Sequence, residues 1–140
     1  MIPQEKENYC LCTIISDIFL NYKIVMSQEE IARKLTPSKN GFRVDDEKIK
    51  QFLNKNNFEY EFYWWDKTPF NEPYAVLNEI NNNEGFIGMK DHAYRVLKFI
   101  DPLIIIVNPE NGLLGDFEYT SLMNKLRELD GGFGLIKKLK

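Results

Sequence analysis

The spacing of apolar residues changes along this chain, from helical in the first half to strand-like in the second. Residues 10–19 carry apolar side chains at helical spacing, which predicts a buried helix that begins at a cysteine. Ser27 followed by Glu30 has the pattern of a capping box and predicts a second helix. Asp45 or Asp46 is expected to cap a third helix. The first half is therefore predicted to be mostly helical.

The second half is predicted to be mostly β-sheet, because short apolar runs alternate there with turn residues. The expected strands are Phe58 to Trp65, Gly85 to Met89, His92 to Phe99, Leu103 to Val107 and Phe133 to Leu139, with helices at Pro73 to Ile80 and Tyr119 to Leu129. We read Gly131-Gly132 as the stop of the last helix. Helices followed by strands with short connections are typical of an α+β fold with an antiparallel sheet.

The length and the net charge of the chain argue against several classes of function. The 140 residues favour a single domain over 1–140. Lys and Arg number 18 and Asp and Glu 21, a net charge of -3, which argues against a nucleic-acid partner or an anionic membrane. The longest purely apolar run, Leu103 to Val107, is far shorter than the ~20 residues that cross a bilayer. Residues 1–8 do not resemble a signal peptide, so we expect a soluble cytoplasmic protein.

The two cysteines have different expected roles. Cys10 lies in the first turn of the predicted helix, where the helix dipole lowers the pKa of a thiol. Cys12 is two residues further on and points elsewhere, so it is expected to be a small buried apolar residue. Together with His92, the only histidine, they supply three metal ligands at most. A metal site is therefore not expected.

His92 begins a predicted strand that turns at Asp101-Pro102 and returns as the next strand. If the hairpin folds near residue 100, residues whose numbers add up to about 200 lie opposite each other, ~5 Å apart. Asn108 is then the partner of His92. Glu110 has the same strand parity and is a weaker candidate, whereas Asp101 lies at the far end of the hairpin.

These residues are the parts of a Cys-His-Asn triad. His92 takes the proton of the Cys10 thiol and later protonates a leaving amine, while Asn108 orients the imidazole ring. The developing oxyanion also needs donors. The backbone N–H of Cys10 is one candidate, and the side-chain amide of Gln4 is another.

Joint order and spacing make the chain resemble a known family over about Pro3 to Lys137. Gln4 lies six residues before Cys10, and His92 on an apolar strand is followed by Val107-Asn108-Pro109. This pattern resembles the double-glycine-leader (bacteriocin-processing) cysteine peptidases of the papain-like superfamily. The resemblance implies a papain-like fold, with the nucleophile helix packed on an antiparallel sheet. It also implies thiol peptidase activity on a peptide or protein substrate, without a metal or cofactor.

Three departures from the family pattern keep other functions open. Leu11 and Asp91 stand where the family usually has glycine, and Asn108 stands where most members have Asp. Many members are the front end of a membrane exporter, so specificity for a double-glycine leader is not carried over. One alternative is an inactive papain-like module that binds a peptide or leader segment. Another is an unrelated α+β domain in which Cys10 and His92 are structural.

The densest aromatic group is Tyr63, Trp64 and Trp65. Packing within the core and sheet is the simpler role for these side chains. The other role is to form one wall of a peptide groove.

Overall fold

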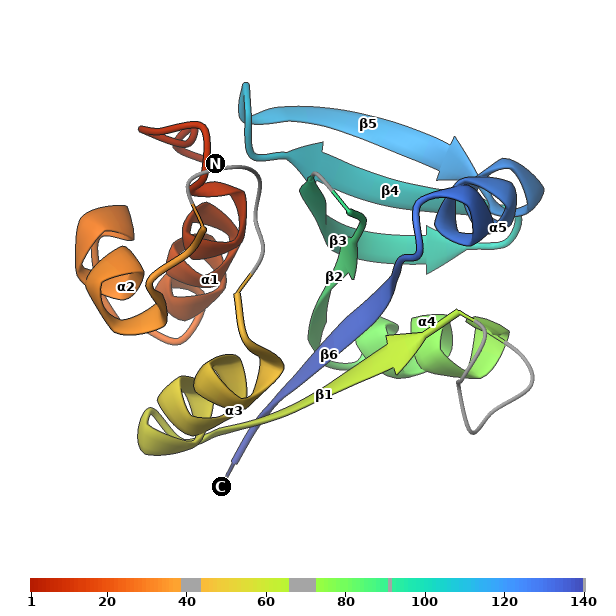
Figure 1. Cartoon of the computed structure of the whole chain (residues 1–140). Helices are drawn as coiled ribbons and strands as arrows, with labels where there is room; N and C mark the ends of the chain where they lie inside the picture. Colours follow the sequence, from red (N-terminus) through yellow and green to blue (C-terminus); the bar gives the residue numbers. More distant parts are fainter. Residues whose placement is uncertain (39–43, 66–72, 91, 140) are drawn as a thin grey trace.

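The computed structural model describes residues 1–38, 44–65, 73–90 and 92–139 (Figure 1). Gly41, where the sequence predicts a break before the third helix, and Asp91 lie outside these residues. The helices are α1 (Cys10–Leu20), α2 (Gln28–Leu35), α3 (Asp46–Lys55), α4 (Pro73–Asn81) and α5 (Tyr119–Glu128). The strands are β1 (Phe58–Trp64), β2 (Glu84–Gly88), β3 (Ala93–Ile100), β4 (Leu103–Asn108), β5 (Leu113–Glu118) and β6 (Gly132–Lys138).

The strands form one antiparallel sheet in the order β1-β6-β2-β3-β4-β5. Helices α1, α2 and α3 gather on one side of the sheet, and α4 and α5 lie on the other (Figure 1). Neighbouring side chains of β2 join different cores: Phe86 packs with the first group of helices, and Ile87 with the second. The predicted α+β fold, with the helix that begins at Cys10 packed on an antiparallel sheet, is confirmed.

The predicted helix starts are also confirmed. Ser27 Oγ accepts a hydrogen bond from the Glu30 N–H at 3.1 Å, and Asp45 Oδ1 accepts from the Glu47 N–H at 2.9 Å. Each side chain satisfies a backbone donor that the first turn of a helix leaves unpaired. Within the described residues, no helix has the length and apolar character needed to cross a membrane.

Strand β5 was not predicted, because its sequence lacks the alternation that identifies half-buried strands. It lies at the sheet edge and pairs only with β4 among the described strands. Its side chains Leu113 and Leu114 are 64% and 71% exposed, and Gly115 follows them. Pairing with β4, not burial of an apolar face, therefore defines this strand.

The stop of α5 differs from the expectation. Asp130, with φ 50, takes the left-handed position after the helix, and the Gly131 N–H donates to the Leu126 carbonyl at 2.9 Å. The two glycines are needed for close packing instead. A Cβ on Gly131 would lie 2.5 Å from the Gly88 carbonyl oxygen, and one on Gly132 would lie 2.3 Å from that of Tyr63. Gly131-Gly132 is therefore a packed entry into β6.

The expected register of the β3–β4 hairpin is wrong. Ile100 pairs with Leu103, so the chain turns at Asp101-Pro102 itself, and Arg95 pairs with Val107 after a shift in register. The irregularity lies between Val96 and Lys98 and displaces the pairing by one residue. Continued toward the start of β3, this register places residue 110, not residue 108, directly opposite residue 92.

Candidate functional site

The first residue of α1 is Cys10, and its side chain is buried at 1% exposure. The side chain of Tyr9, the N-cap residue, makes no capping hydrogen bond, and the first turn holds no acidic residue. The positive end of the helix dipole therefore faces the thiol without a neighbouring carboxylate in that turn.

Cys12 is chemically different from Cys10. It is fully buried, and this burial, together with the charge of Cys10, raises the pKa of its thiol to about 12. A thiol with so high a pKa is protonated at neutral pH and is a poor nucleophile. Cys12 is thus a buried apolar residue, as the sequence predicted.

His92 and Asn108 meet despite the shifted register. The distance from His92 Nε2 to Asn108 Oδ1 is 2.8 Å. Asn108 Oδ1 also accepts a hydrogen bond from the Glu110 N–H at 3.0 Å, which fixes this atom as the amide oxygen. An amide oxygen only accepts, so Nε2 carries the proton and Nδ1 of the neutral ring is left as the basic nitrogen. The Tyr94 ring packs edge-on against the imidazole, with centroids 4.7 Å apart.

The other candidate partners of His92 do not hold its ring. Glu110 contributes its backbone N–H to the Asn108 oxygen. Asp101 lies at the far end of the hairpin, where its carboxylate accepts a hydrogen bond from the Tyr74 hydroxyl at 3.3 Å. Among the described residues, no group of three or more His, Cys, Asp and Glu is arranged to hold a metal ion.

The segment around Gln4 lies against the end of β4. The Gln4 N–H donates to the Pro109 carbonyl at 2.7 Å, one residue beyond Asn108. From α2, the buried Gln28 side chain accepts from the Glu5 N–H at 2.8 Å and donates to the Pro3 carbonyl at 3.0 Å. These contacts place Gln4 between β4 and the turn that leads into α1.

The Gln4 amide is occupied in this conformation. Its Nε2 donates to the carbonyl oxygens of Lys6 and Glu7, at 3.0 and 3.1 Å. Its Oε1 is buried and has no partner within the described part of the chain. Both amide hydrogens are therefore in use, and Gln4 can stabilise an oxyanion only after at least one of these bonds is released.

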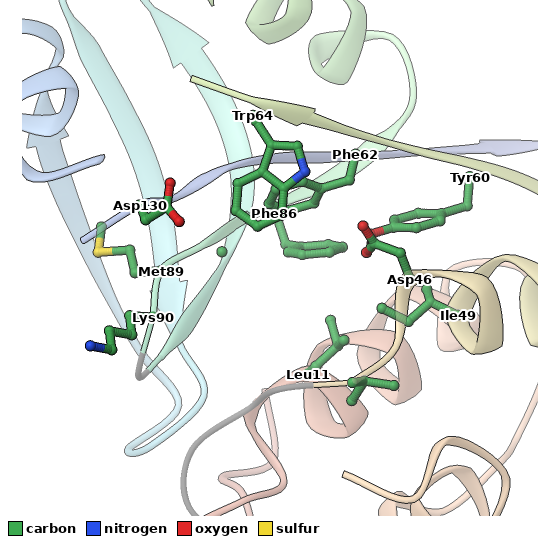
Figure 2. A pocket seen from close by; sticks show the side chains of 12 residues that line it. Leu11, Asp46, Ile49, Tyr60, Phe62, Trp64, Phe86, Met89, Lys90 and Asp130 are labelled. Carbon is green, nitrogen blue, oxygen red and sulfur yellow. The ribbon is translucent and has the colours of Figure 1, made fainter. Parts of the chain in front are cut away.

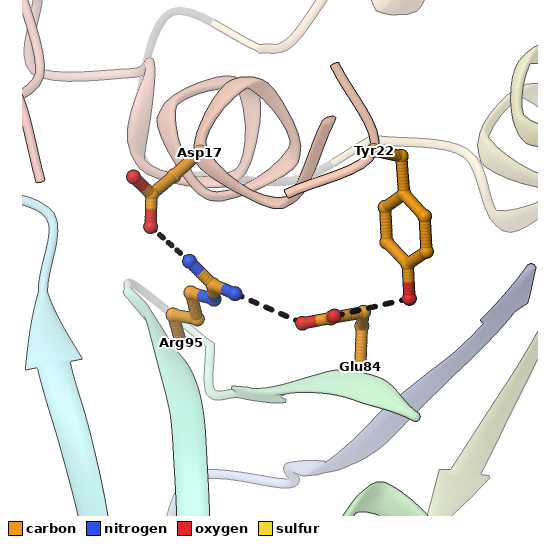
Figure 3. A network of polar contacts seen from close by, with 4 residues as sticks. All are labelled: Asp17, Tyr22, Glu84 and Arg95. Atoms are coloured by element: carbon orange, nitrogen blue, oxygen red, sulfur yellow. Dashed lines mark hydrogen bonds and ion pairs between the residues drawn. The ribbon is translucent and has the colours of Figure 1, made fainter. Parts of the chain in front are cut away.

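An ion-pair network joins the helix that carries Cys10 to the strand that follows His92 (Figure 3). Arg95 on β3 is 6% exposed and contacts Asp17 of α1 and, at 2.9 Å, Glu84 of β2. The Tyr22 hydroxyl donates to the second oxygen of Glu84 at 3.1 Å. This buried cation therefore ties α1 to two neighbouring strands.

The ion pairs of Arg95 matter for the candidate site because they lie close, along the chain, to both Cys10 and His92. Asp17 is two helical turns after Cys10, so both lie on one face of α1, ~10 Å apart. Arg95 is three residues after His92, which is also ~10 Å along the strand. Figure 1 shows the N-terminal end of α1 and the start of β3 toward the same end of the molecule.

A hollow of about 310 Å³ lies between α1, α3 and strands β1 and β2 (Figure 2). Leu11, the residue after Cys10, forms part of its floor. On the opposite side it is lined by Met89, whose N–H donates to the His92 carbonyl at 2.8 Å. The hollow is therefore lined by the residue that follows Cys10 and by a residue whose backbone is hydrogen-bonded to that of His92.

The aromatic residues Tyr63, Trp64 and Trp65 have different surroundings: one lines the hollow, and the other two pack in the second core. Trp64 is 37% exposed and lines the hollow, whereas Tyr63 is buried on the opposite face. Trp65 packs with the second core, and the Arg127 guanidinium lies 4.9 Å from its ring centroid. No sequence pattern identified the other lining residues, because they come from separate elements; among them are Asp46, Tyr60, Phe86, Met89 and Asp130.

Comparisons with known proteins were made by sequence and by structure. No protein-family model matches the chain, and no curated protein sequence matches it. One similar solved structure is a double glycine motif protease from an AMS/PCAT transporter, in complex with the leader peptide. It is 14% identical, has a TM-score of 0.72, and the alignment covers 99% of this chain and 90% of that one.

A second similar structure is the peptidase domain of Streptococcus ComA, a bi-functional ABC transporter involved in a quorum-sensing pathway. It is also 14% identical, with a TM-score of 0.70 over 98% of this chain and 97% of that chain. The chain thus has the fold of double-glycine peptidase domains over nearly its whole length.

Proposed function

We propose that this protein is a cysteine peptidase that cleaves a peptide bond through an acyl-enzyme, with Cys10, His92 and Asn108 as its triad. The observation that carries the proposal is the 2.8 Å contact between His92 Nε2 and Asn108 Oδ1. It leaves Nδ1 as the base, on a fold shared with peptidase domains. The start of α1 supplies the nucleophile.

The proposed reaction proceeds in two halves. His92 Nδ1 takes the proton from the Cys10 thiol, and the thiolate attacks the carbonyl carbon of the scissile bond. The tetrahedral intermediate then collapses as His92 gives this proton to the leaving amine, and a thioester remains on Cys10. A water molecule hydrolyses the thioester, with His92 again as the base, and restores the thiol.

Two donors are proposed for the oxyanion. The Cys10 backbone N–H lies in the first turn of α1, where backbone N–H groups point toward the end of the helix. The Gln4 amide becomes a second donor when a substrate displaces it from the Lys6 or Glu7 carbonyl. The buried, unpaired Oε1 of Gln4 favours such a movement, since the present position leaves a polar atom unsatisfied.

The proposed substrate is a peptide, and a leader peptide in particular. A similar structure was solved in complex with a leader peptide. In this chain, the hollow beside Leu11 and Met89 offers a place for substrate residues next to the bond to be cleaved. We propose that the reaction takes place in the cytoplasm, without a cofactor.

The test is hydrolysis of a proteome-derived peptide library, read by mass spectrometry. Wild type is expected to produce new peptide ends, and Cys10→Ala and His92→Ala are expected to lose them. Trapping with the wild type should also show a thioester adduct on Cys10. Unchanged hydrolysis in both variants would rule out the proposed triad.

The second candidate is an inactive module that binds a peptide in the same hollow. Two observations favour it: the Gln4 amide is occupied, and Leu11 fills a position where the family resemblance predicts glycine. Peptide affinity that is equal in wild type and Cys10→Ala, without any turnover, would support this function over catalysis.

A further inference from the structure

The hollow beside the proposed active site is lined by aromatic rings. Tyr60, Phe62 and Trp64 of β1 and Phe86 of β2 form its walls, and Leu11 forms its floor (Figure 2). The Phe62 and Trp64 rings pack edge-to-face, with centroids 4.8 Å apart. Aromatic faces carry a negative partial charge, so these walls suit either an apolar group or a cation.

The charged residues favour a cation. Among the described residues that line the hollow, the carboxylates of Asp46 and Asp130 outnumber the one ammonium, that of Lys90. Figure 2 shows the two carboxylates on opposite sides of the Phe86 ring, and the Lys90 side chain pointing away from the aromatic rings. The space between the rings is therefore flanked by negative charge at both ends.

Asp46 is held in place without a positive partner. Its Oδ1 accepts a hydrogen bond from the Tyr60 hydroxyl at 3.1 Å, and within the described residues it forms no ion pair. Partial burial raises the pKa of this carboxyl group despite the Tyr60 hydrogen bond, and the neighbouring Asp45 raises it further. An approaching cation would relieve both unfavourable effects.

We propose that this hollow binds a lysine or arginine side chain of the peptide substrate, close to the bond that is cleaved. The aliphatic part of the side chain packs on Leu11 and Phe86, and the charged end lies between the aromatic rings and the carboxylates. Leu11 has a direct role here, because its side chain supplies apolar surface for that aliphatic part. The position of this side chain next to the cleaved bond rests on the proposed function, whereas the binding of a basic side chain in the hollow does not.

The test uses three pools of fluorescein-labelled decapeptides with Arg, citrulline or norleucine at one fixed position and all other positions randomised. Binding to the full chain with Cys10→Ala is followed by fluorescence anisotropy. Citrulline keeps the shape of arginine but removes its charge. The Arg pool is expected to bind about fivefold or more tightly than the citrulline pool.

Variants that neutralise the two carboxylates of the hollow test whether the hollow causes this preference for Arg. Asp46→Asn and Asp130→Asn, each in the Cys10→Ala background, are expected to reduce the preference for Arg over citrulline. Asp116→Asn is the matched control, since it removes the same charge from an exposed position on β5. It should leave the preference unchanged. Circular dichroism checks that the variants fold.

The outcomes separate this inference from the proposed function. Equal binding of the three pools, or a preference for Arg that survives both substitutions in the hollow, would overturn the inference. Cleavage by wild type without any preference for basic residues would overturn it too, while peptidase activity would stand. Arg-selective binding without cleavage would support the inference and leave the protein as a binding module.

Discussion

At the scale of single residues, the orientation of one imidazole ring is decisive. The contact with Asn108 Oδ1 requires the proton on His92 Nε2. His92 is the only histidine in the chain, so the ¹⁵N NMR spectrum of its ring can be assigned without ambiguity. In Cys10→Ala, where no thiolate can hold the ring charged, we predict the Nε2–H tautomer for the neutral ring. A dominant Nδ1–H tautomer would contradict the proposed role of Asn108.

Loss of the Asn108 side chain should weaken catalysis more than folding. Asn108→Ala removes the group that fixes the ring, and we expect peptide hydrolysis to fall on the order of a hundredfold. The Nε2–H tautomer should lose its dominance in the same variant. Asn108→Asp keeps an acceptor at this position and is the control, with most of the activity retained. Hydrolysis rates and the NMR spectrum together check the prediction.

The glycine pair before β6 has a structural role that can be tested directly. A Cβ on Gly132 would lie 2.3 Å from the Tyr63 carbonyl oxygen, so Gly132→Ala is expected to lower the free energy of unfolding by about 1–3 kcal/mol. In the control Gly115→Ala, the added Cβ meets only the end of the Ile106 side chain, at 3.3 Å. Urea denaturation should show a clear loss for Gly132→Ala and a much smaller change for Gly115→Ala.

At the scale of elements, the buried Arg95 holds α1 against the sheet. Arg95→Met leaves Asp17 and Glu84 without their cation, and we expect a loss of about 3 kcal/mol in the free energy of unfolding. The exposed pair between Lys137 and Glu79, at 3.1 Å, is the natural comparison. Lys137→Met should cost less than ~1 kcal/mol. Equal losses in urea denaturation would show that the network does not hold α1 in place.

Elements that carry their own local signal were predictable from the sequence. Ser27 and Asp45 mark helix starts through bonds to nearby backbone N–H groups, so a short stretch of sequence contains the whole signal. Strand β5 forms through pairing with β4, so its own residues do not identify it. The register of the β3–β4 hairpin depends on a bulge near Leu97, and no residue type there indicates a bulge. The His92–Asn108 contact was predicted correctly although the predicted register was wrong. The observed register differs from the predicted one by two residues, and such a shift keeps Asn108 on the same face of the sheet as His92.

At the scale of the whole molecule, the residues that shape the hollow could not be found from the sequence. Leu11, Asp46, Trp64, Phe86 and Asp130 come from five different parts of the chain and meet only when the helices pack on the sheet. The same holds for the ion pairs of Arg95, whose three residues come from three elements. The order of helices and strands was nevertheless sufficient for the fold class, since it determines how the layers assemble.

If Cys10 is an activated nucleophile paired with His92, the pH dependence of its alkylation rate reveals the pairing. Fragment ions in mass spectrometry separate Cys10 from Cys12, whose burial raises its pKa to about 12 and keeps it unreactive as an internal control. We predict a Cys10 rate that stays high down to about pH 5–6 and falls in His92→Ala. A rate that rises only near the ordinary thiol pKa of ~8.5, and does not depend on His92, would mean that Cys10 is not activated by His92.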